Sequence, residues 1–303
     1  MLIKIEDLHP KNLINFYYNL YPENIFQTMR GYYFFIGKWR YFFVQYLDDI
    51  DEVKKIYDRH LYLLNNNIYV HHIIVNKDGN ILTFVDGKYY VLMLTAYYDK
   101  KISFDDVVSF SNKIIFSDMV INNGSIWALK NDSLEYQVNM LGYNYPLMRK
   151  SFSYFFAFGE TAIQLFNSIE KNAFLSFSHK RVEYLEDIYD FYNPFNILID
   201  YRVRDVVEYL KSKFFSGLDI FDDMVNYFNK NNLSYDEYLI FLARMLYPTY
   251  YFDLIEEIIK GKKKDDDLSG LINRAYEYEK LMKKLYRFYK TFLSIPTIEW
   301  LEY

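Results

Sequence analysis

The spacing of hydrophobic residues changes once along the chain, and this change divides the sequence into two parts. Before about residue 97, aromatic and β-branched residues form short segments separated by glycine-containing turns, a pattern typical of β-strands. From residue 103 onward, apolar residues recur mostly at helical spacing. We therefore predict an α+β protein with a small N-terminal lobe over residues 1–97 and a large, mainly helical C-terminal lobe over 98–303.

The N-terminal lobe is predicted to be an antiparallel sheet that carries one helix. Its first two strands form a hairpin around Gly37, and the apolar spacing that follows predicts a helix over residues 48–65. Three further strands, separated by turns at Gly79 and Gly87, complete the lobe. The strands are predicted at 32–36, 39–46, 70–75, 81–85 and 89–94.

The C-terminal lobe is predicted to consist of helices, with an irregular stretch over about 176–196. Hydrophobic residues make up 51% of the chain, which is enough for a sizeable core in both lobes. The helices are predicted at 104–115, 133–141, 146–167, 203–215, 218–229, 235–246, 250–259 and 268–293.

Charge and composition argue against several classes of function. The net charge of −5 gives no electrostatic reason to expect binding to nucleic acid. Cysteine is absent, so the chain has neither a disulfide framework nor a thiolate metal site. Neither a membrane span nor an N-terminal signal peptide is expected, because no apolar run is long enough, and the predicted location is cytoplasmic. The 34 tyrosines reflect either an AT-rich genome or an adhesive contact surface.

Five segments, in order along the chain, carry a resemblance to one protein family. Together they resemble the spore-coat-associated, kinase-like proteins of endospore-forming Firmicutes, specifically the YutH branch of the CotS-like group. The resemblance extends from about residue 32 to the C-terminus. The segments are 151–169 (SFSYFFAFGETAIQLFNSI), 177–181 (FSHKR), 199–209 (IDYRVRDVVEY), 241–252 (FLARMLYPTYYF) and 295–301 (IPTIEWL).

This resemblance implies a protein-kinase-like fold, of the type found in aminoglycoside and choline phosphotransferases. The predicted order of strand, strand, helix and further strands, followed by helices, agrees with that fold. The resemblance also implies a role in the sporulating mother cell or the spore coat, with coat or sporulation proteins as partners.

Phosphoryl transfer in this fold requires a lysine on the third strand and a carboxylate on the next helix, which together hold the nucleotide phosphates. By the resemblance, the lysine position falls at or near Gln45, whose neutral amide cannot supply the charge. Lys38 lies nearby, but in the predicted hairpin turn, where a solvated lysine is the simpler interpretation. Glu52 matches the helix carboxylate, or is an exposed acid that favours the helix dipole. No G-x-G-x-x-G loop occurs, so tight nucleotide binding is not expected.

The catalytic loop of the wider superfamily contains His-Gly-Asp followed closely by Asn. Here His179 matches the histidine, but Arg181 occupies the aspartate position and Glu186 lies near the asparagine position. A guanidinium that stays protonated cannot accept the proton of a substrate hydroxyl. We predict that His179 is a packed, hydrogen-bonded loop residue. Arg204 and Asp205, which match an Arg-Asp pair at the start of a family helix, are predicted to form a structural ion pair or cap.

The magnesium ligands of the superfamily are only partly matched. Asp190 begins a Asp-Phe-Tyr sequence that is similar to Asp-Phe-Gly, and Asn193 or Asp200 can be aligned near the same position. Asp200 matches better a later aspartate that precedes the Arg-Asp pair. Asp187 and Asp190 are therefore the only plausible magnesium carboxylates, and an Asp-rich surface loop is the plainer interpretation.

These observations favour a catalytically inactive, kinase-like protein, a pseudokinase, that acts as a protein-interaction scaffold in the mother cell or the spore coat. No cofactor is expected under this hypothesis. The alternative is an active phosphotransferase with a rearranged ATP and magnesium site, in which Asp187, Asp190 or Asp200 binds metal and Lys38 or Lys180 binds phosphate. A third possibility is a sensor that binds a nucleotide or a sugar phosphate without turnover.

Overall fold

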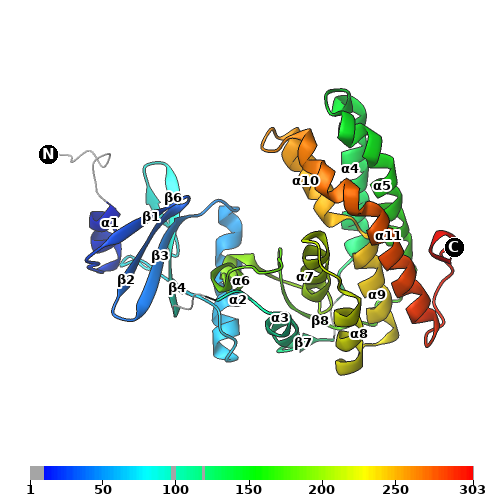
Figure 1. Ribbon diagram of the computed structural model, residues 1–303. Coiled ribbons are helices and arrows are strands. Elements are labelled where there is room, and N and C mark those ends of the chain that lie inside the picture. The colour runs from blue at the N-terminus through cyan, green and yellow to red at the C-terminus, as the bar shows by residue number, and fades with distance from the viewer. Residues whose placement is uncertain (1–9, 97–99, 118–119, 303) are drawn as a thin grey trace. The chain divides into compact units, whose positions relative to one another are not determined.

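The computed structural model describes residues 10–96, 100–117 and 120–302, and the chain forms two compact units (Figure 1). The sheet unit comprises residues 1–102 and 185–197, and the helical unit comprises 103–184 and 198–303. This division differs from the predicted boundary at 97/98 mainly because residues 185–197 pack with the sheet. Phe195 and Tyr189 of that segment contact the hydrophobic core of the sheet unit, which explains the assignment.

The sheet unit has a six-stranded antiparallel sheet in the order β1-β2-β3-β6-β4, with β5 paired to β6. The predicted α+β class, the five predicted strands and the single helix after the hairpin are confirmed, whereas β1 and α1 were not predicted. The elements are α1 Pro10–Tyr18, β1 Ile25–Thr28, β2 Gly31–Ile36, β3 Trp39–Gln45, a 3₁₀ turn Ile50–Glu52, α2 Val53–Asn65, β4 His72–Ile74, β5 Thr83–Val85, β6 Lys88–Ala96, α6 Ile188–Phe191 and a 3₁₀ turn Pro194–Asn196.

The two faces of this sheet are covered by different elements. On one face, Ile14 and Tyr18 of α1 pack against Phe34, Phe43 and Leu92. Alternate residues of a strand point to opposite sides of the sheet. The residues that point to the other face pack against α2 and the segment 185–197. The second core cluster contains Tyr46, Ile56, Ile73, Val91, Met93 and Phe195.

In the helical unit most predicted helices are confirmed, two of them with the predicted bounds. The helix predicted at 104–115 ends at Ser111, and the helix predicted at 133–141 begins at Asn123, where the side chain of Asn122 accepts a hydrogen bond from the backbone of Ser125. The elements are α3 Phe104–Ser111, β7 Ile115–Phe116, α4 Asn123–Leu141, a 3₁₀ turn Gly142–Asn144, α5 Pro146–Asn167, β8 Leu175–His179, β9 Ile197–Tyr201, α7 Arg204–Phe215, α8 Phe221–Lys230, α9 Tyr235–Leu246, α10 Thr249–Ile259, a 3₁₀ turn Asp265–Leu268, α11 Ser269–Lys290 and α12 Glu299–Glu302.

The predicted irregular stretch over 176–196 contains regular structure. β8 lies in a small sheet of order β7-β8-β9, and all five of its residues are buried. The polar residues of β8 made it resemble a loop in the sequence, yet Ser176, Ser178 and His179 are each fully buried.

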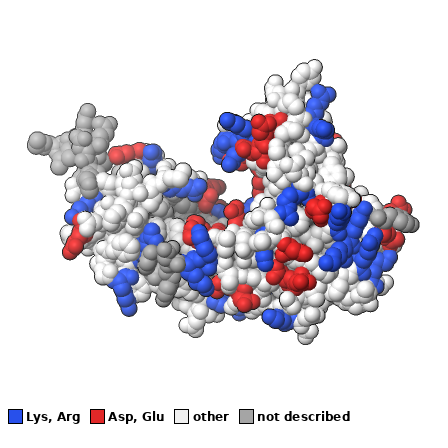
Figure 2. Space-filling view, viewed as in Figure 1, with Lys and Arg blue, Asp and Glu red and all other residues white. Residues whose placement is uncertain are grey.

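None of the described helices is long and apolar enough to cross a membrane. Acidic and basic side chains are interspersed on the face of the molecule shown in Figure 2.

Candidate functional site

Gln45, the residue assigned to the lysine position, lies at the end of β3 opposite Tyr90 of β6. It is on the α1 face of the sheet, because Tyr41 and Phe43, four and two residues earlier, pack in the cluster beneath α1. Val44 lies on the opposite face and contacts the cluster beneath α2. The end of β3 therefore presents a valine, not Gln45, to the helix that would carry the phosphate-orienting carboxylate.

The helix α2 turns no acidic side chain toward the sheet. Its buried residues are Ile56, His60 and Leu63. Glu52 precedes the helix in a 3₁₀ turn, where its carboxylate pairs with the ammonium of Lys55 at 2.7 Å near the surface. Lys38 lies in the β2–β3 turn with its ammonium 5.3 Å from the centre of the Trp39 ring. The facing residues of β3 and α2 thus contain no lysine–carboxylate pair.

Arg40 is the cation that β3 does place on the α2 face, and the sequence analysis did not single it out. Its guanidinium lies over the rings of Tyr33 and Phe42, at 4.4 and 4.6 Å from their centres. The ring of Tyr189, from the segment 185–197, lies 3.8 Å from the ring of Phe42. Strict alternation along residues 39–45 would have placed Arg40 and Phe42 on one face and Gln45 on the other.

The two candidate magnesium carboxylates lie at the start of α6 in the sheet unit. Asp187 pairs with the ammonium of Lys101 at 2.7 Å, and both side chains are about half exposed. Asp190 is exposed on α6, and the side chain of Asn193 accepts a hydrogen bond from the backbone of Phe195 instead of facing a metal. No three His, Asp or Glu side chains converge on a metal position in the described part of the chain.

His179 ends β8 and is held by Asp205, the second residue of α7. The backbone N–H of His179 donates to one carboxylate oxygen of Asp205 at 2.9 Å, and its Nδ1 lies 2.6 Å from the other. Both side chains are completely buried. Arg204, the first residue of α7, donates to the carbonyl oxygens of His179 and Lys180. The pair Arg204-Asp205 therefore fastens the loop that follows β8 to the start of α7.

Asp200, at the end of β9, is enclosed by positive charge. Its carboxylate forms ion pairs with Arg204 and with Arg244 of α9, and it accepts a hydrogen bond from the side-chain amide of Asn123. Burial by itself would raise the pKa of Asp200, but the two guanidinium groups and the amide lower it to about 2. A carboxylate already neutralised by two buried cations has little charge left for a magnesium ion.

Arg181 extends from the loop after β8 and forms an ion pair with Asp253 of α10. Asp253 also pairs with Lys130 of α4 at 2.6 Å, and Lys130 pairs with Glu256 at 3.0 Å. These residues link α4, α10 and the loop by alternating charges. Neither Lys130 nor Asp253 was identified from the sequence, because Lys130 and Asp253 are 123 positions apart and Arg181 and Asp253 are 72 apart.

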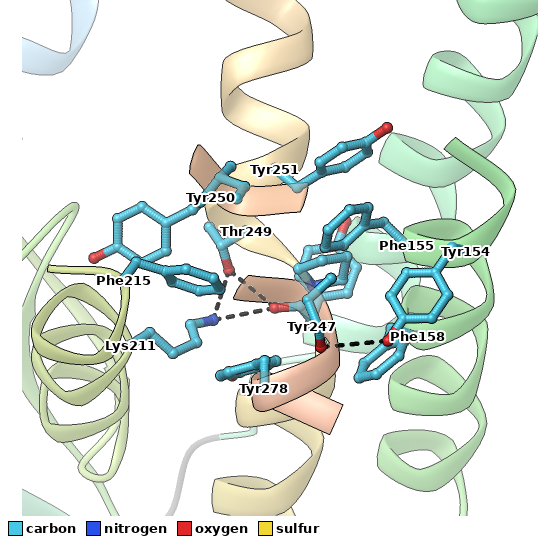
Figure 3. Close-up of a pocket in the computed structure, with 13 residues that line it drawn as sticks. Tyr154, Phe155, Phe158, Lys211, Phe215, Tyr247, Thr249, Tyr250, Tyr251 and Tyr278 are labelled. Atoms are coloured by element: carbon cyan, nitrogen blue, oxygen red, sulfur yellow. Dashed lines mark hydrogen bonds between the residues drawn. The ribbon is translucent and has the colours of Figure 1, made fainter. Parts of the chain in front are cut away.

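The ammonium of a buried lysine, Lys211 of α7, lies at the junction of α9 and α10 (Figure 3). The ammonium of Lys211 donates to the carbonyl oxygens of Arg244 and Tyr247 and to the hydroxyl of Thr249, at 2.9 to 3.1 Å. The two carbonyls lie at the end of α9, where carbonyls lack helical partners, and Thr249 begins α10. Burial lowers the pKa of Lys211 to about 8, although Glu208 at 3.4 Å favours its charged form.

Lys211 also borders a narrow pocket with aromatic walls. The pocket lies within the helical unit, between α5, α7, α11 and the α9–α10 junction, and Figure 3 shows the side chains that line it. No sequence motif marks it, because its residues come from four separate helices. Its aromatic lining residues are Tyr154, Phe155, Phe158, Phe215, Tyr247, Tyr250, Tyr251 and Tyr278.

The fold is of the protein-kinase-like, aminoglycoside phosphotransferase type, as predicted. A crystal structure of an aminoglycoside phosphotransferase from Alicyclobacillus acidocaldarius matches with a TM-score of 0.66 and 10% identity, over 90% of this chain and 94% of that one. An AMP-bound spectinomycin phosphotransferase matches at 0.56 and 11% identity, over 90% and 93% of the two chains. An amicoumacin kinase in complex with AMP-PNP and Ca²⁺ matches at 0.52 and 11%, over 88% and 92%.

The resemblance to spore coat kinase-like proteins is also confirmed. The model of the family described as "Spore coat putative kinase YutH" matches residues 141–285, a range that begins at the end of α4 and ends within α11. The matched range contains the loop after β8, α7 and the ion pairs of Asp200. A search of curated proteins found no match to this chain.

Proposed function

We propose that this protein is a catalytically inactive, kinase-like protein that acts in the mother cell or the spore coat by binding other proteins. The match to the spore coat family supports the setting, and the phosphotransferase fold supports the kinase-like framework. The observation that carries the proposed inactivity is the guanidinium of Arg181, in the loop where the superfamily has its catalytic aspartate.

The chemistry of that loop opposes phosphoryl transfer. An active enzyme of this type needs a carboxylate that orients the attacking hydroxyl and accepts its proton. Arg181 stays protonated at every physiological pH, and Asp253 holds its guanidinium in an ion pair. The loop thus contributes a permanent cation at a position where the reaction requires a base.

The metal-binding carboxylates and the phosphate-binding lysine that the reaction requires are also poorly matched in this chain. Asp200 is neutralised by Arg204 and Arg244, so the alternative in which it binds metal loses support. Asp187 pairs with Lys101, so an active, rearranged site would have to break that ion pair before Asp187 could bind a metal. Asp190, the other candidate carboxylate, is exposed on α6. In the sheet unit, Val44 lies where a phosphate-binding lysine would face α2.

A thermal-shift experiment tests the proposal. A ligand that binds only the folded protein raises its stability by about 2.7 kcal/mol at a hundred times its Kd. We expect no change in Tm with ATP at about 5 mM, with or without Mg²⁺ or Mn²⁺, and no transfer or hydrolysis of the γ-phosphate.

An Asp190→Asn variant and an Asp222→Asn variant, the latter changed on the exposed start of α8, serve as a matched pair. A metal-dependent shift that Asp190→Asn abolishes and Asp222→Asn retains would support the active alternative or the sensor. Phosphate release would then identify the enzyme, and binding without release would identify the sensor. Phosphate release would refute the proposed inactivity, and binding without release would refute the expectation that no nucleotide binds.

A further inference from the structure

The helix α4 is apolar on two opposite sides, only one of which is buried. Its buried side packs through Trp127, Leu134 and Val138. Large apolar side chains also stand on the outer side, where burial against α5 does not reach them. The exposed fractions are 59% for Ile126, 71% for Leu129, 68% for Tyr136 and 65% for Met140, and 85% for Tyr143 in the turn that follows.

The exposed residues follow a heptad spacing. Ile126, Leu129, Ser133, Tyr136, Met140 and Tyr143, which we call the α4 seam, are separated alternately by three and four positions. This is the spacing of the a and d positions with which one helix packs along another. A single exposed leucine or tyrosine is ordinary on a protein surface, but a continuous apolar stripe indicates a contact surface.

We propose that the α4 seam joins two copies of this chain, with the two α4 helices packed antiparallel about a twofold axis. Residues at heptad spacing pack against a partner helix. Each copy of the chain presents the same helix, so the surface can pair with itself about a twofold axis. In antiparallel pairs an a position faces a d position of the partner. The alignment in which the two seams overlap over their whole length places Ser133 opposite Tyr136, Leu129 opposite Met140, and Ile126 opposite Tyr143 of the second copy.

This register matches large side chains with small ones. The smallest residue of the seam, Ser133, faces the ring of Tyr136, whereas a parallel pair would set Tyr136 against Tyr136 and leave a gap at Ser133. The flanking positions also avoid contact between like charges, because Lys130 faces Gln137 and Asp132 faces Asn139 of the second copy. Lys130 already has its partners Asp253 and Glu256 within its own chain.

The exposed area is of the size that a modest dimer needs. A tyrosine side chain can bury about 150–250 Å², so the five apolar residues of the seam offer several hundred Å² on each copy. A standard interface buries about 800 Å² per partner. We therefore expect a reversible dimer with a Kd in the micromolar range rather than a permanent one.

Sedimentation of the full-length chain over about 1 to 200 μM tests the proposal. The wild type is expected to show a monomer–dimer equilibrium, and Leu129→Glu or Tyr136→Glu is expected to raise the dimer Kd at least about tenfold. Glu135→Gln, on an exposed part of α4 outside the seam, is the control and is expected to leave the Kd unchanged. Unchanged helicity and Tm would show that the seam variants still fold.

Cross-linking tests the antiparallel register, and the absence of native cysteine keeps the background low. A mixture of Leu129→Cys and Met140→Cys chains is expected to form disulfide-linked heterodimers, because these positions face each other. Either variant alone should link poorly, since like positions would lie roughly 16 Å apart along the helix axis.

Three outcomes would overturn the proposal. One is a wild-type protein that stays monomeric throughout the concentration range. Another is a dimer that the seam variants do not weaken, which would place the interface elsewhere. The third is efficient linking of Leu129→Cys to itself, which would indicate parallel helices.

Discussion

The two units of this protein treat the parts of a phosphotransferase site in opposite ways. In the sheet unit the surfaces that meet are mainly apolar: Val44 of β3 and Ile56 of α2 lie in one cluster, and Phe42 packs against Tyr189. In the helical unit the charges are numerous, but they are paired with one another, as in the ion pairs of Asp200. The comparison contrasts apolar packing, which offers no charge to a ligand, with paired charge, in which the carboxylate of Asp200 is already balanced by two guanidinium groups.

The difference has an energetic consequence. A buried ion pair contributes little net stability compared with apolar side chains, but removing one partner strands the other charge in a medium of low dielectric constant. The core of the sheet unit is stabilised mainly by the burial of aromatic rings, and removing one ring leaves no uncompensated charge behind. We therefore expect the helical unit to be more sensitive to loss of single charges, and the sheet unit to be more sensitive to steric changes and to protonation of its buried histidines.

The largest effect is expected from Arg244→Met. This change removes one of the two guanidinium groups that balance Asp200 and leaves Arg204 as its remaining ion-pair partner, so the free energy of unfolding should fall by about 3–5 kcal/mol. Urea denaturation followed by circular dichroism measures it. The control is Lys280→Met, which removes an exposed ion pair to Glu277 on α11 and should cost less than about 1 kcal/mol. Equal losses in both variants would contradict the picture of a finely balanced buried network.

Protonation of His60 and His71 should give the next largest effect. Burial, opposed or assisted by weaker contacts, lowers the pKa of each to about 4. Because the unfolded chain has a pKa near 6.5, it binds more protons between pH 6.5 and 4, and stability falls as the pH is lowered through this window. The loss approaches about 3 kcal/mol for each histidine.

The two units should respond differently to that acidification. The ring Nε2 of His60 accepts a hydrogen bond from the backbone of Ile73, which protonation would break, whereas Asp200 keeps its charge until far lower pH. At pH 4.5 the protection of backbone amides against hydrogen exchange, relative to the intrinsic rate at that pH, should therefore fall in β3 and β6 before it falls in α9. His60→Gln, which keeps an acceptor, should reduce the pH dependence, and the exposed His72→Gln should not. An equal loss of protection in both units would argue against the histidines.

The sequence predicted most of the fold because the determinants were local. Periodicity identified α5 and α9 with their observed bounds, and the hairpin of β2 and β3 followed from Gly37 and its flanking strands. The α1 helix was missed because nine residues carry a short apolar pattern, and β8 was missed because its serines and histidine are polar but buried. Propensity describes a residue by itself, so it cannot show that a polar residue such as His179 is buried with a hydrogen-bond partner from a distant part of the chain.

The site was less predictable for a related reason. Arg181 and Asp205 were found because the family resemblance assigns them positions. Asp253 and Arg244, which neutralise Arg181 and Asp200, lie far along the chain, and no local pattern connects these pairs. The face on which Gln45 lies could have been deduced from the sequence of β3, since successive side chains of a strand point to opposite faces of the sheet.

A steric change in the sheet unit is expected to have a smaller, still measurable effect. Gly31 has φ of 154°, and a Cβ there would lie 2.2 Å from the carbonyl oxygen of Phe43 in the paired strand. Gly31→Ala should therefore cost about 2–3 kcal/mol of stability. Gly37→Ala is the matched control: its φ is also positive, at 58°, but no neighbour lies within 4 Å, so only about 1 kcal/mol should be lost. Similar losses would mean that the sheet adjusts to the added methyl group.

The smallest effect is expected from Gln45→Lys, which restores a lysine at the position matched by the resemblance. Because Gln45 lies on the α1 face, its new ammonium would point away from α2, and we expect no Tm shift with ATP and magnesium. Stability should change by less than about 0.5 kcal/mol, since the side chain is only half-buried. Val44→Lys, on the α2 face, is the informative partner variant. A nucleotide-dependent shift in Gln45→Lys but not in Val44→Lys would contradict the assignment of Gln45 to the α1 face.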